Sequence, residues 1–322
     1  MRFVAPLLLM LGLALPALAQ EWSPSRPVRL IVPWSAGGST DAIGRALAAR
    51  LQETVGQPVI VENRPGANAQ VGTEAAVKSA PDGHTLTVIE LPHAVAPAVV
   101  AHLPYDVQRD LAPVAMLGAS PLILSGQAGA GAPADIAAYL KFARSASPPI
   151  AIGNSGTGSS AHLAAAVFGE RAGIKLIHVP YKGAAPALAD VASGAVQGCF
   201  ATLASGAGLV SSGKLRPVAV ASSRRMSAAV VAAVPTFAEA GLGELEMLQW
   251  WAFAVPASTP AETIERLRRE TLAALEHPQV KDRFAALGVE PRPSTRDELR
   301  AFIRAELARW QDAAKRAGLK PE

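Results

Sequence analysis

Short apolar runs alternate with amphipathic segments along most of the chain. Apolar and β-branched residues at 28–32, 59–61 and 85–89 predict three strands. Apolar residues recur at helical spacing between 43 and 51, which predicts an amphipathic helix behind the first strand. Three strand–helix units in succession favour a parallel sheet with both faces covered by helices.

A second series of the same kind follows a stretch rich in glycine, alanine and proline at 126–135. Its predicted elements are strands at 149–152, 176–179, 196–200 and 217–221, with helices at 161–168 and 186–192. The order of strand, glycine-rich loop and helix therefore occurs in both halves of the chain. This pattern predicts an α/β fold with two domains of similar size.

The last third of the chain predicts helices that serve as scaffold. Thr259 and Glu262 flank Pro260 as a capping box, and Pro278 is placed to begin a second helix. A third helix is predicted after Thr295, with its apolar face directed inward.

The first 19 residues are expected to be removed. Arg2 precedes an apolar run, and the segment ends in Ala17-Leu18-Ala19, which is typical of a signal-peptidase site. Cleavage after Ala19 predicts an exported protein. No later apolar stretch reaches the roughly 18–20 residues that a membrane span needs.

Composition narrows the possible partners. The single cysteine, Cys199, excludes an intrachain disulfide. Loss of Arg2 with the signal segment leaves 29 basic against 26 acidic residues, a formal charge of +3. These charges are scattered without a basic stripe, so no nucleic-acid binding is expected. A small anionic ligand is compatible with this balance.

Three motifs resemble known sites of chemistry. Residues 156–161 match the dinucleotide pattern G-x-G-x-x-A, but the next predicted strand is followed by no acidic residue for a ribose. Residues 208–214 resemble a phosphate loop, but Leu215 stands where a magnesium-binding Ser or Thr is needed. Ser155 lacks the G-x-S-x-G sequence of a hydrolase nucleophile. A Ser–His–acid triad stays open as an alternative, because its residues can come together in the fold from distant positions of the chain. No metal-ligand cluster is present, so no metal or cofactor is predicted.

Two glycine-rich loops remain, at 36–41 and 153–160, each between a predicted strand and helix. Glycines before a helix allow backbone N–H groups to approach an anion. Two such loops facing one another in an exported two-domain protein predict an anion site between them.

The ordered motifs of this chain resemble those of the exported solute-binding proteins of tripartite tricarboxylate transporters, the Bug or TctC-like receptors. The matching segments are PWSAGGSTD at 33–41, VENRPGA at 61–67, PDGHTL at 81–86, GTGSSAHLA at 156–164, HVPYKG at 178–183 and PTFAEAG at 235–241. They extend over nearly all of the chain from Arg26 onward.

The resemblance implies a periplasmic clamshell, the Venus flytrap fold of periplasmic binding proteins, in which each domain is a mixed, mostly parallel sheet flanked by helices. It further implies capture of a small carboxylate in the interdomain cleft and delivery to membrane permease subunits, without catalysis. The chain is expected to cross between lobes near Ser120 and to return near Val234. Domain 1 would then comprise 20–120 and 235–322, and domain 2 would comprise 121–234.

The resemblance also implies ligand contacts. These are Ser35, Ala36, Gly37, Gly38 and a loop around Leu91 and His93 in the first domain, and Ser155, Gly156, Thr157, Gly158, Lys182, Gly183 and Ala184 in the second. Asp41, in the first turn of the predicted helix, is expected to interact with N–H groups and the helix dipole rather than with the ligand, and His162 to be a packing or capping residue.

Two departures from the family pattern bear on ligand choice. Glu90 follows the third predicted strand, where many relatives have small polar residues. A carboxylate near an anion site would have a raised pKa or would repel the ligand, unless it points away from the site. If it points inward, it could meet an amine or hydroxyl of the ligand. Gly198 and Ala201 occupy positions where relatives commonly carry Asp, so Ala201 is a second candidate for selectivity.

Two other functions stay open from the sequence. One is an exported α/β serine hydrolase, which turnover of an ester would distinguish from a receptor. The other is an orphan ligand sensor, which would use the same clamshell with a signalling partner in place of a permease.

Overall fold

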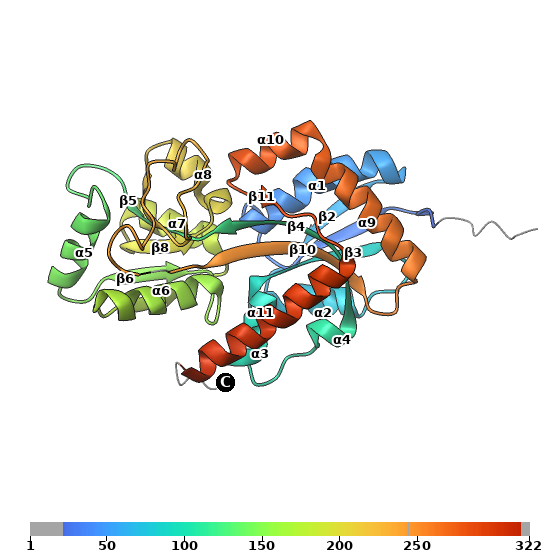
Figure 1. Ribbon diagram of the computed structural model, residues 1–322, viewed down its shortest axis with the longest axis horizontal. Coiled ribbons are helices and arrows are strands. Elements are labelled where there is room, and N and C mark those ends of the chain that lie inside the picture. The colour runs from blue at the N-terminus through green and yellow to red at the C-terminus, as the bar shows by residue number, and fades with distance from the viewer. Residues whose placement is uncertain (1–21, 244, 317–322) are drawn as a thin grey trace, which may run out of the picture.

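Two lobes, each built on one sheet, make up the protein (Figure 1). The computed structural model describes residues 22–243 and 245–316. The predicted signal segment at 1–19 lies outside the described residues. We call the lobe that contains the first strand the first lobe.

The sheet of the first lobe has six strands in the order β11-β4-β10-β3-β1-β2. They are β1 (Val28–Val32), β2 (Val59–Asn63), β3 (Thr85–Glu90), β4 (Leu111–Pro121), β10 (Leu248–Pro256) and β11 (Glu290–Pro291). β1 pairs in parallel with β2 and β3, as predicted. The other half of the sheet is antiparallel, because β10 runs against both β3 and β4.

Helices cover both faces of this sheet (Figure 1). They are α1 (Ser39–Val55), α2 (Gln70–Val77), α3 (Leu91–Val99), α4 (Val107–Asp110), α9 (Ala261–Glu276), α10 (Pro278–Ala286) and α11 (Arg296–Arg316). α1, α9 and α10 lie on one face, and α2, α3 and α11 lie on the other. The apolar face predicted for α1 packs against the sheet through Ile43 and Leu47, which are buried.

The structure confirms two of the predicted helix ends and contradicts the cap predicted for a third. α1 ends at Gly56, whose φ of 74° is left-handed. The capping box at the start of α11 is confirmed by bonds in both directions between Thr295 and Glu298. The prediction of a capping box at Thr259 is wrong, because the side chain of Thr259 bonds elsewhere. Its hydroxyl donates to the carbonyl of Pro256 at 2.7 Å, and α9 starts without a side-chain cap.

The second lobe has a five-stranded sheet in the order β7-β6-β8-β5-β9. Its strands are β5 (Ile123–Gln127), β6 (Ala151–Asn154), β7 (Ile177–Pro180), β8 (Gly198–Ala201) and β9 (Leu215–Val220), and its helices are α5 (Ile136–Ser145), α6 (Ser160–Ala172), α7 (Ala184–Ser193) and α8 (Leu203–Ser211). β6 is parallel to β7 and β8, whereas β5 is antiparallel to its neighbours. Phe168, Phe200 and Phe237 pack together in its core.

Two extended segments connect the lobes side by side. The first passes directly from β4 to β5 at Leu122, close to the crossing predicted near Ser120. The second stays bonded to the second lobe well beyond Val234, because Thr236 pairs with Val220 and the N–H of Met247 donates to Ala221. The return to the first sheet therefore comes at Leu248, later than the sequence predicted.

The lobes share part of their core. One continuous cluster of buried side chains includes Leu91 and Val95 of α3 together with Phe168 and Phe200 of the second lobe. No helix among the described residues combines the length and the apolar character that crossing a bilayer requires.

Candidate functional site

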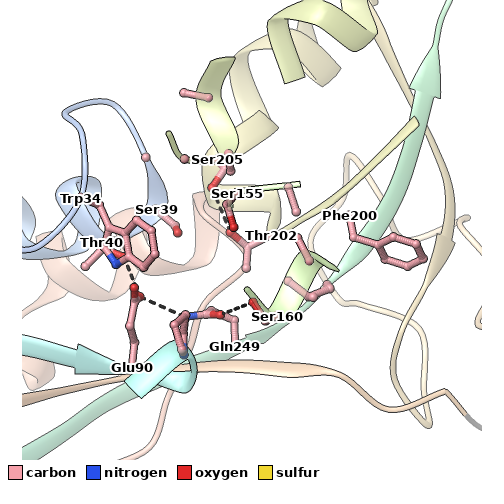
Figure 2. A pocket seen from close by; sticks show the side chains of 18 of the residues that line it. Trp34, Ser39, Thr40, Glu90, Ser155, Ser160, Phe200, Thr202, Ser205 and Gln249 are labelled. Atoms are coloured by element: carbon pink, nitrogen blue, oxygen red, sulfur yellow. Dashed lines mark hydrogen bonds between the residues drawn. The ribbon is translucent and has the colours of Figure 1, made fainter. Parts of the chain in front are cut away.

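A small cavity of about 70 Å³ lies between the two lobes (Figure 2). Both lobes and the connecting segments contribute to its wall. The lining residues are Trp34, Ser35, Gly38, Ser39, Thr40, Glu90, Pro92, Leu122, Ser155, Ser160, Ala161, Gly183, Ala184, Ala185, Pro186, Phe200, Ala201, Thr202, Ser205 and Gln249. We call this space the interlobe cavity.

The topology brings several helix N-termini to the cavity. A helix is the next element after each of the strands β1, β3, β6, β7 and β8, so these helices start near the carboxyl ends of the strands. The crevice at such strand ends is where open α/β sheets bind ligands. The first turns of α1, α3, α6, α7 and α8 all contribute lining residues.

Three of these helix starts are left uncapped by side chains. α1 begins after Gly38, α7 after Gly183 and α8 after Thr202, and none of these three has a side-chain cap hydrogen bond. α6 differs, because the hydroxyl of Ser159 accepts from the N–H of His162 at 3.2 Å. Unpaired N–H groups and the positive end of the helix dipole both favour an anion at such termini.

No lysine, arginine or histidine side chain is found among the described residues that line the cavity. An anion bound there would be held by backbone N–H groups and by hydroxyls such as those of Ser39, Ser155 and Thr202. Lys182, which the resemblance placed at the ligand, does not line the cavity. Its carbonyl accepts from the hydroxyl of Ser35 at 3.2 Å, which links the two lobes at the rim.

The N–H groups of the glycine-rich loops were predicted to face an anion, but three of them donate to side chains of the protein. The N–H of Gly37 donates to Asp41 at 3.0 Å, that of Gly156 to Asn154 at 3.0 Å, and that of Gly158 to His162 at 3.1 Å. These three glycines shape their own turns, and their N–H groups already have acceptors. The N–H groups of Gly37, Gly156 and Gly158 are therefore not free to bind an anion.

Asp41 has the role expected of it. It is 5% exposed and accepts from Arg45 and Asn63 as well as from its own loop. Burial opposes its ionisation, but these hydrogen bonds outweigh burial and lower its pKa. It ties the loop before α1 to the end of β2 and does not line the cavity.

The cavity brings together only part of the predicted site. The predicted site residues that line the cavity are Ser35, Gly38, Glu90, Ser155, Gly183, Ala184 and Ala201. The predicted site residues that do not line it are Ala36, Gly37, Leu91, His93, Gly156, Thr157, Gly158 and Lys182. Which of them contact a ligand stays a prediction. The segment at 91–93, expected as a loop, is the first turn of α3, and only Pro92 of that turn reaches the cavity.

His93 faces the interior of the fold, whereas His162 is half-buried. The ring of His93 is buried, accepts from the N–H of Glu90 at 3.1 Å and lies 2.8 Å from the hydroxyl of Thr73. Burial lowers its pKa to about 4, so the ring is neutral. His162 packs against His178 with ring centroids 4.8 Å apart, in line with the packing role predicted for it. Within the described part of the chain no cluster of metal ligands occurs.

Glu90 points inward, and it is the centre of a buried network (Figure 2). Its Oε2 accepts from the hydroxyl of Thr40 at 2.7 Å and from the amide of Gln249 at 2.9 Å. Trp251 donates to Thr40 at 3.1 Å, and Ser160 donates to Gln249 at 3.1 Å. Burial raises the pKa of Glu90 to about 7, although these donors partly offset it.

Sequence reasoning missed several cavity residues. Five lining residues with hydrogen-bonding side chains were not proposed as site residues from the sequence: Trp34, Ser160, Thr202, Ser205 and Gln249. Ser160 lies in the first helical turn after the second glycine loop, a position that could have indicated it. Gln249 gave no such signal, because β10 was not predicted as a strand.

Comparison with known proteins agrees with this architecture. The family model described as the tripartite tricarboxylate transporter family receptor matches residues 43–319. The protein BugT of Bordetella pertussis is 37% identical over 311 residues, which cover 96% of this chain and 94% of BugT.

Solved structures match both lobes together. The periplasmic binding protein BugD superposes with a TM-score of 0.87 at 28% identity, covering 93% of this chain and 100% of BugD. The R. palustris protein Rpa4515 with adipate also gives a TM-score of 0.87, at 31% identity over 93% of this chain and 99% of that protein. The fold is that of the two-domain periplasmic binding proteins, and the chain belongs to the tripartite tricarboxylate transporter receptor family.

Proposed function

We propose that this protein is an extracytoplasmic receptor that captures a small organic carboxylate in the interlobe cavity. It then delivers the ligand to the membrane permease subunits of a tripartite tricarboxylate-type transporter. The observation that carries the proposal is the convergence of helix N-termini on a cavity without cationic side chains. Such a site suits a carboxylate that is bound and later released unchanged.

The energetics are sufficient for a receptor. One helix terminus contributes about 0.3–2 kcal/mol to holding an anion. Several termini that close on one ligand, with water excluded, can supply the roughly 8 kcal/mol of a micromolar complex. The bound adipate of the related R. palustris protein supports a carboxylate as the ligand class.

Domain closure is the motion that such a receptor uses. The two connecting segments at Leu122 and Leu248 form the hinge, and ligand binding would favour the closed arrangement by its contacts with both lobes. Export to the periplasm after cleavage at Ala19 would place the receptor beside its permease.

The serine hydrolase alternative has less support. The cavity contains serine hydroxyls, but no histidine lines it among the described residues. His162 and His178 face each other instead, and the N–H of Gly158 donates to His162. A serine in the cavity would therefore lack the imidazole base that activates it.

A thermal-shift screen of residues 20–322 tests the proposal. Mono-, di- and tricarboxylates, amino acids and aromatic acids are each added in large excess. If the protein is a receptor, its melting temperature should rise with ligands of one chemical class, because the ligand binds only the folded state. The hits are then incubated with the protein and recovered unchanged. Turnover of a chromogenic ester that a serine-reactive phosphonate blocks would overturn the receptor proposal in favour of a hydrolase.

A further inference from the structure

Glu90 is the one ionisable side chain among the described residues that line the interlobe cavity. It stands in a receptor site that is otherwise built to attract negative charge. A second carboxylate beside a bound carboxylate costs binding energy unless something compensates it. The surroundings of Glu90 indicate what that compensation is.

The direction of each hydrogen bond around Glu90 follows from the partners. The hydroxyl of Thr40 accepts from the indole N–H of Trp251, so its own hydrogen is directed at Oε2 of Glu90. The carbonyl oxygen of Gln249 accepts from Ser160, so its amide hydrogens are directed at the same Oε2. Both neighbours therefore act as donors, which suits the ionised carboxylate.

A third N–H group lies beside Glu90. The indole N–H of Trp34 is buried without a hydrogen-bond partner, and Figure 2 shows its ring directed toward Glu90. Its proximity also favours the ionised form of the acid. With donors on Oε2, the other oxygen of the carboxylate, Oε1, is left to accept a hydrogen bond from a ligand.

From this geometry, and on the basis of the receptor function proposed above, we propose that Glu90 binds an ammonium group of the ligand while the helix N-termini bind its carboxylate. The ligand class is then an amino acid or a short amino-carboxylate, with no net charge. A ligand with carboxylates at both ends would place one of them against Glu90. That arrangement would require a proton on the acid, among neighbours that present donors.

Matched probes separate these possibilities. Calorimetric titrations at pH 8 compare acetate with glycine, propionate with alanine and β-alanine, and butyrate with 4-aminobutyrate, with succinate as the dicarboxylate. Glu90→Gln keeps the shape and removes the charge. We expect at least one amino-carboxylate to bind at least about tenfold more tightly than its plain counterpart, and Glu90→Gln to remove that preference.

The outcomes distinguish the two proposals. Plain carboxylates or succinate that bind the wild type as tightly as the best amino counterpart would overturn the role of Glu90 and leave the receptor in place. An amino preference that survives in Glu90→Gln would overturn it as well. If no probe binds here and no acid binds in the screen, the receptor proposal itself fails.

Proton exchange gives a second readout on the wild type, which does not depend on how the variant folds. The groups facing Glu90 are Thr40 from α1, Gln249 and Trp251 from β10, and Trp34, none of which titrates near neutrality. His93 on its own helix is neutral. Titration at pH 7 in buffers of different ionisation enthalpy should therefore report Glu90. We expect proton release with an amino-carboxylate, and proton uptake on binding it would overturn the proposal.

Discussion

The amide of Gln249 donates to the carboxyl group of Glu90 at 2.9 Å, although 159 positions separate the two residues in the chain. Gln249 lies at the start of β10, next to the hinge, and Ser160 of the second lobe donates to the same amide. The buried acid of the first lobe is thereby connected to the second lobe through a single side chain. Lobe closure and the state of Glu90 are expected to be coupled.

Replacement of Thr40 by valine should destabilise the protein. The hydroxyl both accepts from Trp251 and donates to Glu90, so its loss leaves the buried indole N–H of Trp251 without an acceptor and removes one of the donors to Glu90. We expect the free energy of unfolding to fall by about 1–3 kcal/mol. Urea denaturation measures the change. Thr40→Ser keeps the hydroxyl and should lose less than half as much. Equal losses in both variants would contradict the hydrogen-bond explanation.

Glu90 should make stability depend on pH in a defined direction. Its pKa is raised from 4.5 to about 7, so the folded protein keeps a proton that the unfolded chain has lost between these values. Stability contributed by this group is therefore full below pH 4.5 and is lost as pH rises to 7. The total loss is about 3 kcal/mol, from roughly 1.4 kcal/mol per pKa unit.

Glu90→Gln isolates that contribution. His93, whose pKa is lowered to about 4, acts in the opposite direction because its stability is lost as pH falls from 6.5. His93 is present in both proteins, so its effect largely cancels in their difference. Denaturant melts from pH 4.5 to 8 should show the variant gaining stability relative to wild type as pH rises. A difference that is constant over this range would contradict the assignment.

Gly158 should tolerate no side chain. Its φ is 74°, and a Cβ there would lie 2.8 Å from the methyl group of Val99 across the interlobe contact. Gly158→Ala should cost more stability than Gly173→Ala, where φ is 64° but no atom lies within 4 Å. Backbone strain of about 1–3 kcal/mol applies to both variants, so the excess measures the clash. The addition of Val99→Ala should remove most of that excess in thermal melts.

Cys199 should be unreactive in the folded protein. It is completely buried in β8, and burial raises the pKa of its thiol to about 12. An aromatic disulfide reagent at pH 8 should modify it only at the rate of unfolding, and fully in strong denaturant. Rapid labelling of the native protein would contradict its placement.

The sequence predicted local features better than distant ones. Apolar periodicity located β1 and α1, and Thr295 with Glu298 identified a helix start. β10 was missed because nearly all of its residues are buried, so it lacks the alternation that marks a half-exposed strand. The return of the chain at Leu248 depends on pairing with β4, which no local pattern reports.

The site shows the same limit. The glycine loops before α1 and α6 were correctly predicted to precede helices at the cavity. Their N–H groups, however, are bound by Asp41 and His162, one turn further along each helix. Spacing indicates that a loop can bind an anion, but it does not show whether a nearby side chain already occupies the N–H groups. Convergence of helix starts from both lobes follows only from the tertiary fold.

Calorimetric titration of a carboxylate into wild-type protein and two α7 variants tests the central claim most directly. Ala184→Asp adds a carboxylate in the first turn of α7, at the cavity, where the helix dipole favours it and the fold should persist. Ala189→Asp adds the same charge at an exposed position of that helix. With the best acid of the thermal screen, we predict one site in wild type and in Ala189→Asp, and at least a hundredfold weaker binding in Ala184→Asp. Equal affinity in all three proteins would show that the ligand does not bind at these helix N-termini.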